Sequence, residues 1–326
     1  MELKPELISR LEQLEKKYSA MGQDIISYLD GLLYADYLTY WDYIHLDTLL
    51  TMQNPKTSLP DEEIFIMYHQ ITELYFKMML HEYDQISKQV ELKVDFMIAR
   101  ITRINRYFDN LTHSFDVMID GMELEQFHKF RMALLPASGF QSAQYRMIEI
   151  CSTDFINLIS KDLRDKYADK PNTSKPNTSL EEMFEHIYWK AGATELATGK
   201  KTLTLKQFEE KYSHQLIVLA EKYKDLNLWK LYKSFSSEDQ KNEKLINALK
   251  LLDVNVNINW PLSHYKSAVR YLQKDPEDIK ATGGTNWQKY LPPRFQKRIF
   301  YPILWSIEDL ENWGKKWVET EVFGQK

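Results

Sequence analysis

Residues 60 to 92 place apolar side chains three and four residues apart, which is the spacing of an α-helix and not of a strand. Pro60 and the three acidic residues that follow it stand where the start of a helix favours proline and negative charge. We therefore predict one long helix here, with one apolar face. The spaced side chains are Phe65, Tyr68, Ile71, Tyr75, Met78 and Met79.

The same spacing recurs along most of the chain, and the low content of 10 glycines and 11 prolines leaves few breaks. No alternation of strand, loop and helix appears, so a parallel sheet is not expected. We predict an all-α fold, with residues 1–326 forming a single large helical domain and residues 169–180, which include "KPNTSKPNTS", forming a mobile loop. The predicted helices are 4–33 (one or two), 94–118, 123–135, 140–168, 180–191, 205–235, 239–252, 261–274 and the tail from 296. "NVNINW", residues 255–260, reads as a short extended piece.

Charge and apolar runs exclude several classes of protein. The net charge is -5, with both signs spread through the chain, so we expect no nucleic-acid surface. No run approaches the about 18 apolar residues of a membrane span, and the N-terminus lacks the apolar core of a signal peptide. We predict a cytoplasmic protein with no membrane association. Cys151 is the only cysteine, which rules out an intrachain disulfide and a CxxCH haem-attachment motif; we expect it to be inert core.

Three features could carry chemistry, and each has a plain structural alternative. Phe65 and His69 lie one turn apart on an apolar face, although a core histidine bonded to a carbonyl would fit equally. Arg131 ends an apolar helix and could clamp a carboxylate in bidentate fashion, or it could extend its head group to solvent. His264 could be a haem ligand. His69 and Glu73 lack the further ligands of a bare metal site, and HExxH, GxSxG, GxGxxG and Walker motifs are absent.

Taken together, four stretches of sequence resemble one family. They are "YWDYIHLDTLLTMQNP" preceded by Tyr40, "DEEIFIMYHQITELYFKMMLHE", "FRMALLPASGFQSAQYR", and "HYKSAVR" followed by "ATGGTNWQKYL". In this order, over residues 40 to 290, they are similar to the successive signature blocks of the tryptophan 2,3-dioxygenase family.

The resemblance implies an all-helical enzyme that contains haem b, active with ferrous iron. Such an enzyme opens the pyrrole ring of L-tryptophan with O2 and forms N-formylkynurenine, the first step of kynurenine-type tryptophan catabolism. The resemblance also implies a homotetramer, a dimer of dimers, in which the N-terminal helical segment, residues 1–45 here, contacts the neighbouring subunit.

Carried over motif by motif, the resemblance assigns residues to two sides of a site. On the cofactor side, His264 is the axial ligand of the haem iron, Ser138 and Gly139 lie at the haem edge, and Phe115 occupies a haem-side position where the family commonly has Trp. On the substrate side, His69 faces the indole N–H as the catalytic histidine. The other implied substrate-binding residues are Phe65 and Phe127 as walls, Arg131 on the carboxylate, Thr282 on the head group, and Tyr40 and Tyr43 from the partner subunit.

The chain departs from the family pattern between His264 and Thr282, where it carries extra residues and has Ala281 in place of the usual glycine. Two alternatives therefore stay open. One is a haem enzyme of the same fold that acts on another aromatic amino acid or indole derivative. The other is a non-catalytic helical binding protein.

Overall fold

The computed structural model describes residues 3–36, 38–134, 141–167, 179–194, 200–272 and 297–315. It divides into two compact units, Met1–Asn54 (unit 1) and Pro55–Lys326 (unit 2), which we describe separately. Most of the predicted loop 169–180 lies outside the described residues, as do Ser138, Gly139 and Thr282.

Unit 1 consists of short helices with no core of their own. The side chain of Asp24 accepts a hydrogen bond from the Ile26 N–H, and that of Thr39 accepts one from the Asp42 N–H, so each caps a helix start. No residue of these four helices is buried. The two helices expected within residues 4–33 are confirmed. The helices are α1 (Pro5–Ala20), α2 (Ile25–Leu33), α3 (Tyr40–Tyr43) and α4 (Leu46–Leu49).

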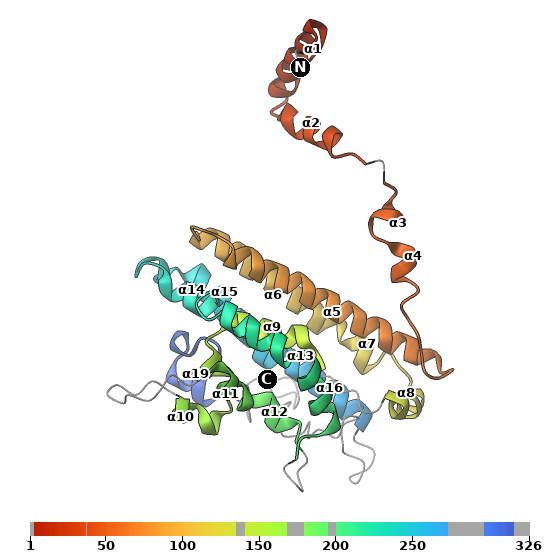
Figure 1. The fold of residues 1–326 in the computed structure, drawn as a ribbon, viewed down its shortest axis with the longest axis vertical. Helices are drawn as coiled ribbons and strands as arrows, with labels where there is room; N and C mark the ends of the chain where they lie inside the picture. The colour runs from red at the N-terminus through yellow and green to blue at the C-terminus, as the bar shows by residue number, and fades with distance from the viewer. Residues whose placement is uncertain are drawn as a thin grey trace. The chain divides into compact units, whose positions relative to one another are not determined.

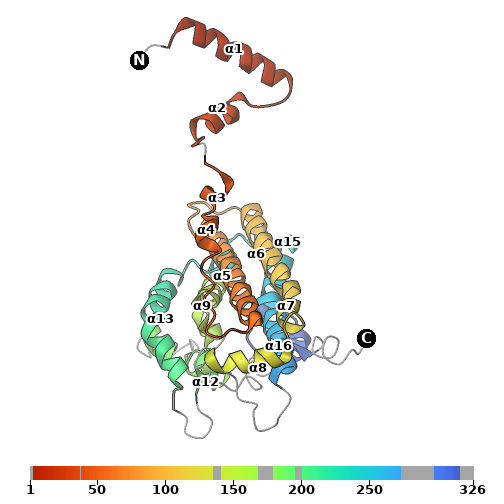
Figure 2. The same ribbon diagram turned by 90° about the vertical axis from the view of Figure 1, so that its right-hand side faces the viewer.

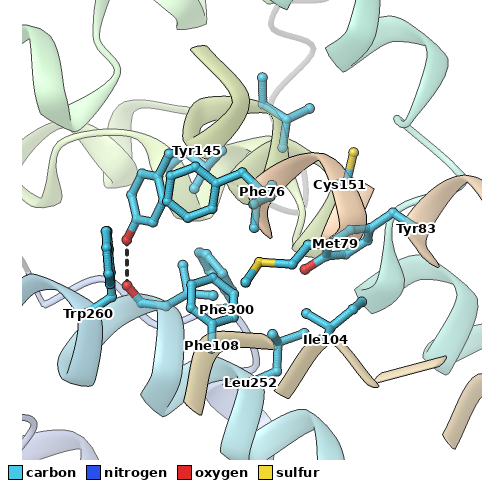
Figure 3. Close-up of a cluster of buried hydrophobic side chains, with 14 of the residues drawn as sticks. Phe76, Met79, Tyr83, Ile104, Phe108, Tyr145, Cys151, Leu252, Trp260 and Phe300 are labelled. Carbon is cyan, nitrogen blue, oxygen red and sulfur yellow. Dashed lines mark hydrogen bonds between the residues drawn. The ribbon is translucent and has the colours of Figure 1, made fainter. Parts of the chain in front are cut away.

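Unit 2 is built around the predicted long helix, which is α5 (Pro60–Ser87). Helix α5 packs against α6 (Val94–Ser114) and α9 (Ala143–Ser152), and α6 packs against α15 (Glu243–Val254) (Figures 1 and 2). The core between them is apolar because the inward faces of these helices carry large side chains such as Phe76, Met79 and Phe108 (Figure 3). The described residues contain no strand, only the isolated bridges Ile159–Ile187 and Thr194–Lys201, so the all-α prediction is confirmed.

The predicted helix 140–168 is wrong as one continuous element. Helix α9 ends at Ser152 because Thr153 adopts an extended backbone, with φ -147° and ψ 169°. The Thr153 hydroxyl then donates to the Phe300 carbonyl at 2.7 Å, which holds the chain in this break. The described elements between α6 and α15 also include α7 (Asp116–Ile119), α8 (Leu124–Phe130), η1 (Arg131–Leu134), η3 (Phe155–Leu158), η4 (Lys161–Leu163), α10 (Arg164–Tyr167), α11 (Leu180–Glu185), α12 (Tyr188–Gly192), α13 (Leu203–Lys222), α14 (Leu228–Ser234) and η5 (Asp239–Lys241).

The extended piece predicted at residues 255–260 is also wrong. Asn255–Asn259 form a π-helical turn, η6, which joins α15 to α16 (Trp260–Leu272) in one unbroken helix. Asn side chains often compete with helix backbone, but here Asn257 donates to Asp253 and Asn259 to Asn255, each four residues back, at 2.7 and 2.8 Å. The elements that follow are η7 (Pro302–Leu304) and α19 (Ile307–Glu311).

The π turn also ties α16 to α9. The Tyr145 hydroxyl donates to the Val256 carbonyl at 2.6 Å, beside Trp260 (Figure 3). Cys151, on the same helix as Tyr145, is free and buried as predicted, and burial raises the pKa of its thiol. None of the described helices is both long and apolar enough to cross a membrane.

Candidate active site

Helix α5 presents Phe65 and His69 one turn apart, with ring centroids 4.1 Å from each other. His69 Nδ1 lies 2.7 Å from the Phe65 carbonyl oxygen. Because a carbonyl can only accept, Nδ1 carries the proton and donates it, which leaves the lone pair of a neutral ring on Nε2. The backbone contact that the plain structural alternative required is therefore present, and it also fixes the tautomer a hydrogen-bond acceptor needs.

The surroundings of His69 are enclosed although solvent reaches its side chain, which is exposed. Burial by the surrounding protein lowers the pKa of the imidazole, and the Phe65 carbonyl and the Glu73 carboxylate oppose that effect. Glu73 is held by α9, since Gln144 Nε2 donates to both its carbonyl and its Oε2 at 2.8 Å. His69 is therefore neutral at pH 7, with Nε2 available as an acceptor.

Aromatic rings from three elements meet next to Phe65. Its ring centroid lies 6.3 Å from that of Phe127 and 5.7 Å from that of Phe130, both on α8. Tyr271 of α16 packs on Phe127 at 4.4 Å. The predicted pairing of Phe65 with Phe127 is thus present, whereas Phe130 and Tyr271 were missed. Phe130 could have been found from its place one turn after Phe127; nothing local points to Tyr271.

Arg131 follows directly after α8 and opens the 3-10 turn η1. Its side chain is half-buried, and its Nη1 atom is buried without a hydrogen-bond partner among the described residues. A buried guanidinium N–H without an acceptor costs free energy that an anionic ligand would recover. This arrangement favours a carboxylate clamp over an arginine whose head group extends to solvent.

His264 lies on α16, one turn after the buried Trp260, and is half-buried. Phe115 packs between them, with ring centroids 5.8 Å from His264 and 5.0 Å from Trp260. Burial lowers the pKa of His264 to about 4, and the nearby charges of His69 and Arg146 lower it further. The imidazole is thus neutral at pH 7, which is the form that binds a metal. Trp260 was missed; its position four residues before His264 was the available signal.

A buried charged cluster lies on the Arg146 side of His264. Arg146 Nη1 donates to Glu149 Oε2 at 2.8 Å and to the Tyr188 hydroxyl oxygen at 2.6 Å, while the Tyr188 hydroxyl itself donates to Glu149 Oε1 at 2.6 Å. Arg298 also donates to Glu149 and Tyr188. We name these four residues the Glu149 cluster. The spacing of Arg146 and Glu149 signals one ion pair, but the other two members come from distant segments and were not predicted.

Tyr40 and Tyr43 belong to α3 of unit 1 and are exposed there. Ser138, Gly139 and Thr282 lie outside the described residues. Of the predicted residues that remain, the structure brings Phe65, His69 and Phe127 into contact, places Phe115 on His264, and leaves Arg131 adjacent to the aromatic pair on α8. Within the described ranges, no group of three His, Cys, Asp or Glu side chains could hold a bare metal ion.

Comparison with known proteins agrees with this geometry. The family model described as tryptophan 2,3-dioxygenase matches residues 33–190. A protein of that name from a Ruegeria species is 40% identical over 117 residues, which cover 36% of this chain and 42% of the relative, so this match spans less than half of the relative's length. A protein of the same name from Bacillus cereus is 30% identical over 286 residues, covering 84% of this chain and 93% of the relative. The chain belongs to the tryptophan 2,3-dioxygenase family.

Proposed function

We propose that this protein is a haem-dependent tryptophan 2,3-dioxygenase that converts L-tryptophan and O2 into N-formylkynurenine. In this reaction the C2–C3 bond of the indole breaks, each of the two carbons gains one oxygen atom of O2, and the nitrogen keeps its hydrogen. The observation that carries the proposal is one site that combines an acceptor nitrogen on His69, aromatic walls and the unpartnered Nη1 of Arg131. An indole, an N–H and a carboxylate are the groups that these residues suit.

The residues present fit haem b. His264 offers a neutral imidazole beside the aromatic rings of Phe115 and Trp260, and Cys151, the only cysteine, is buried as an inert thiol. A single axial histidine leaves the other face of the iron open to a small molecule. When bound, the haem would supply the O2 binding and the oxidation. We assign Ser138 and Gly139 to its edge.

The protein side chains would bind and orient the substrate. Arg131 would hold the carboxylate in bidentate fashion, and Phe65 and Phe127 would hold the indole between apolar surfaces. His69 Nε2 would accept the indole N–H, which fixes the ring and needs no proton abstraction by the protein. We also assign Thr282 to the head group, and Tyr40 and Tyr43 of a neighbouring subunit to the pocket entrance.

We propose that the chain works as a homotetramer in the cytoplasm, with residues 1–45 of each copy covering a neighbour. The support is that unit 1 exposes many large apolar side chains and buries none within its four helices. A segment of this kind gains stability only when another surface covers it.

The test is to load the protein with haem, reduce it without oxygen, and then add L-tryptophan and air while following the absorbance of N-formylkynurenine. The product should form with wild-type protein and should not form with His264→Ala, which should also lose the absorbance band of bound haem. His69→Ala should keep the haem band and lower turnover. A haem spectrum that responds to tryptophan without product would contradict the reaction, and loss of haem from His69→Ala would mean that the two histidines have exchanged roles.

A further inference from the structure

Helix α5 carries a stripe of exposed apolar residues on the side opposite its core face. Met67, Ile71, Leu74 and Met78 are each between 39% and 49% exposed. Their spacings of four, three and four residues are those of the a and d positions of a coiled-coil seam. Large apolar side chains at this spacing are normally covered by another helix, so the α5 stripe needs a partner surface.

The α5 stripe is distinct from the candidate active site. The buried face of the same helix carries Tyr68, Phe76 and Tyr83, and Phe65 and His69 lie at the edge of that face, a little more than a third of a turn or farther from the stripe. Changes to the stripe therefore leave the site residues in place.

We propose that the α5 stripe is the surface by which two copies of this chain pair, with their α5 helices antiparallel. This inference rests on the proposed homo-oligomer and names the surface that forms it. About a two-fold axis between Ile71 and Leu74, Ile71 of one copy meets Leu74 of the other, and Met67 meets Met78. The stripe is thus complementary to itself, as a two-fold interface requires.

The charges at the ends of the stripe favour the antiparallel arrangement. Glu63 and His81 are both exposed and lie on the same side of α5 as the stripe. In the antiparallel pair, Glu63 of one copy lies near His81 of the other, whereas a parallel pair would bring Glu63 against Glu63. Antiparallel helices also align their dipoles favourably.

The length of the α5 stripe sets its share of the interface. Residues 67 to 78 span about 17 Å of helix, which provides the apolar centre of an interface of about 800 Å² per partner but not all of it. The exposed polar residues beside it, such as Glu63 and Lys77, would form the rim.

The experiment measures the molar mass of the purified full-length chain by size-exclusion chromatography with light scattering. Ile71→Glu should lower the wild-type mass by at least half, because the new carboxylate would be buried against Leu74 of the second copy. Val218→Glu is the matched control: Val218 is similarly exposed, but on α13, so the mass should not change. Circular dichroism checks that both variants keep their helix content.

A charge pair distinguishes the arrangements. The double variant Ile71→Lys with Leu74→Glu should restore the wild-type mass, because each antiparallel contact then joins Lys to Glu; a parallel pair would join like charges and stay apart. A wild-type mass with Ile71→Glu would overturn the stripe alone. A monomeric wild type would overturn the homo-oligomer as well. Loss of assembly with Leu32→Glu of α2 but not with Ile71→Glu would mean that unit 1 forms the contact instead.

Discussion

Replacing Glu149 by Gln tests whether its carboxylate balances the buried charges around it. Glu149 is fully buried and accepts hydrogen bonds from Arg146, Arg298 and Tyr188. Both arginine side chains are less than 10% exposed, so neither can turn to water when the carboxylate loses its charge. Two uncompensated buried guanidinium groups should lower the free energy of unfolding by about 3 to 5 kcal/mol.

Glu82 supplies the matched control. It is as buried as Glu149 and also lies near two arginines, Arg100 at 3.6 Å and Arg103 at 3.0 Å, but these side chains are 22% and 44% exposed. They can rehydrate, so Glu82→Gln should cost only about 1.5 kcal/mol. Urea unfolding followed by circular dichroism and by Trp fluorescence measures both. A cost for Glu149→Gln no larger than that for Glu82→Gln would refute the reasoning.

Three further predictions concern pH, packing and binding. Burial raises the pKa of Asp253 from 3.8 to about 6, so the folded state binds this proton more tightly than the unfolded state. That contribution, about 3 kcal/mol, is complete below pH 3.8 and is lost as the pH rises through 6; urea unfolding between pH 4 and 7 should show a smaller fall with rising pH for Asp253→Asn. Gly121→Ala should lower the unfolding free energy by about 1 to 3 kcal/mol, because a Cβ would meet the Val117 carbonyl oxygen at 2.4 Å; an unchanged urea midpoint would contradict this. Arg131→Lys should raise the KM for L-tryptophan more than it lowers kcat, since a lysine cannot form the bidentate pair; steady-state kinetics with an unchanged KM would remove Arg131 from the carboxylate site.

The fold was predictable where local spacing decides it. The apolar residues of α5 repeat at helical spacing, and the structure has the helix at Pro60–Ser87. Prediction failed where contacts between distant segments decide. Thr153 breaks the predicted helix 140–168 because Phe300 accepts its hydroxyl, and the π turn at Asn255–Asn259 depends on packing and side-chain bonds that residue preferences do not carry.

The candidate site divides in the same way. The Phe65–His69 pair follows from one turn of one helix, and Arg131 from its place at the end of an apolar helix. The contact of Tyr271 with Phe127 and the positions of Tyr188 and Arg298 on Glu149 join segments that the sequence does not relate. The roles assigned to His264 and Arg131 stay predictions that the proposed experiments test.

The π turn has a consequence for how the His264 helix tolerates change in length. Leu252 and Tyr271 both face the core, while Arg270, about five α-helical turns after Leu252, is exposed, so the turn advances the helix by one residue. A π turn is in effect one extra residue accommodated within an α-helix. Removing a single residue from Asn255–Asn259 would therefore shorten the helix while both halves keep their faces, and the loss would fall on the carbonyl of Val256 that receives Tyr145. In this helix, a one-residue deletion would be gentler at the turn than anywhere else.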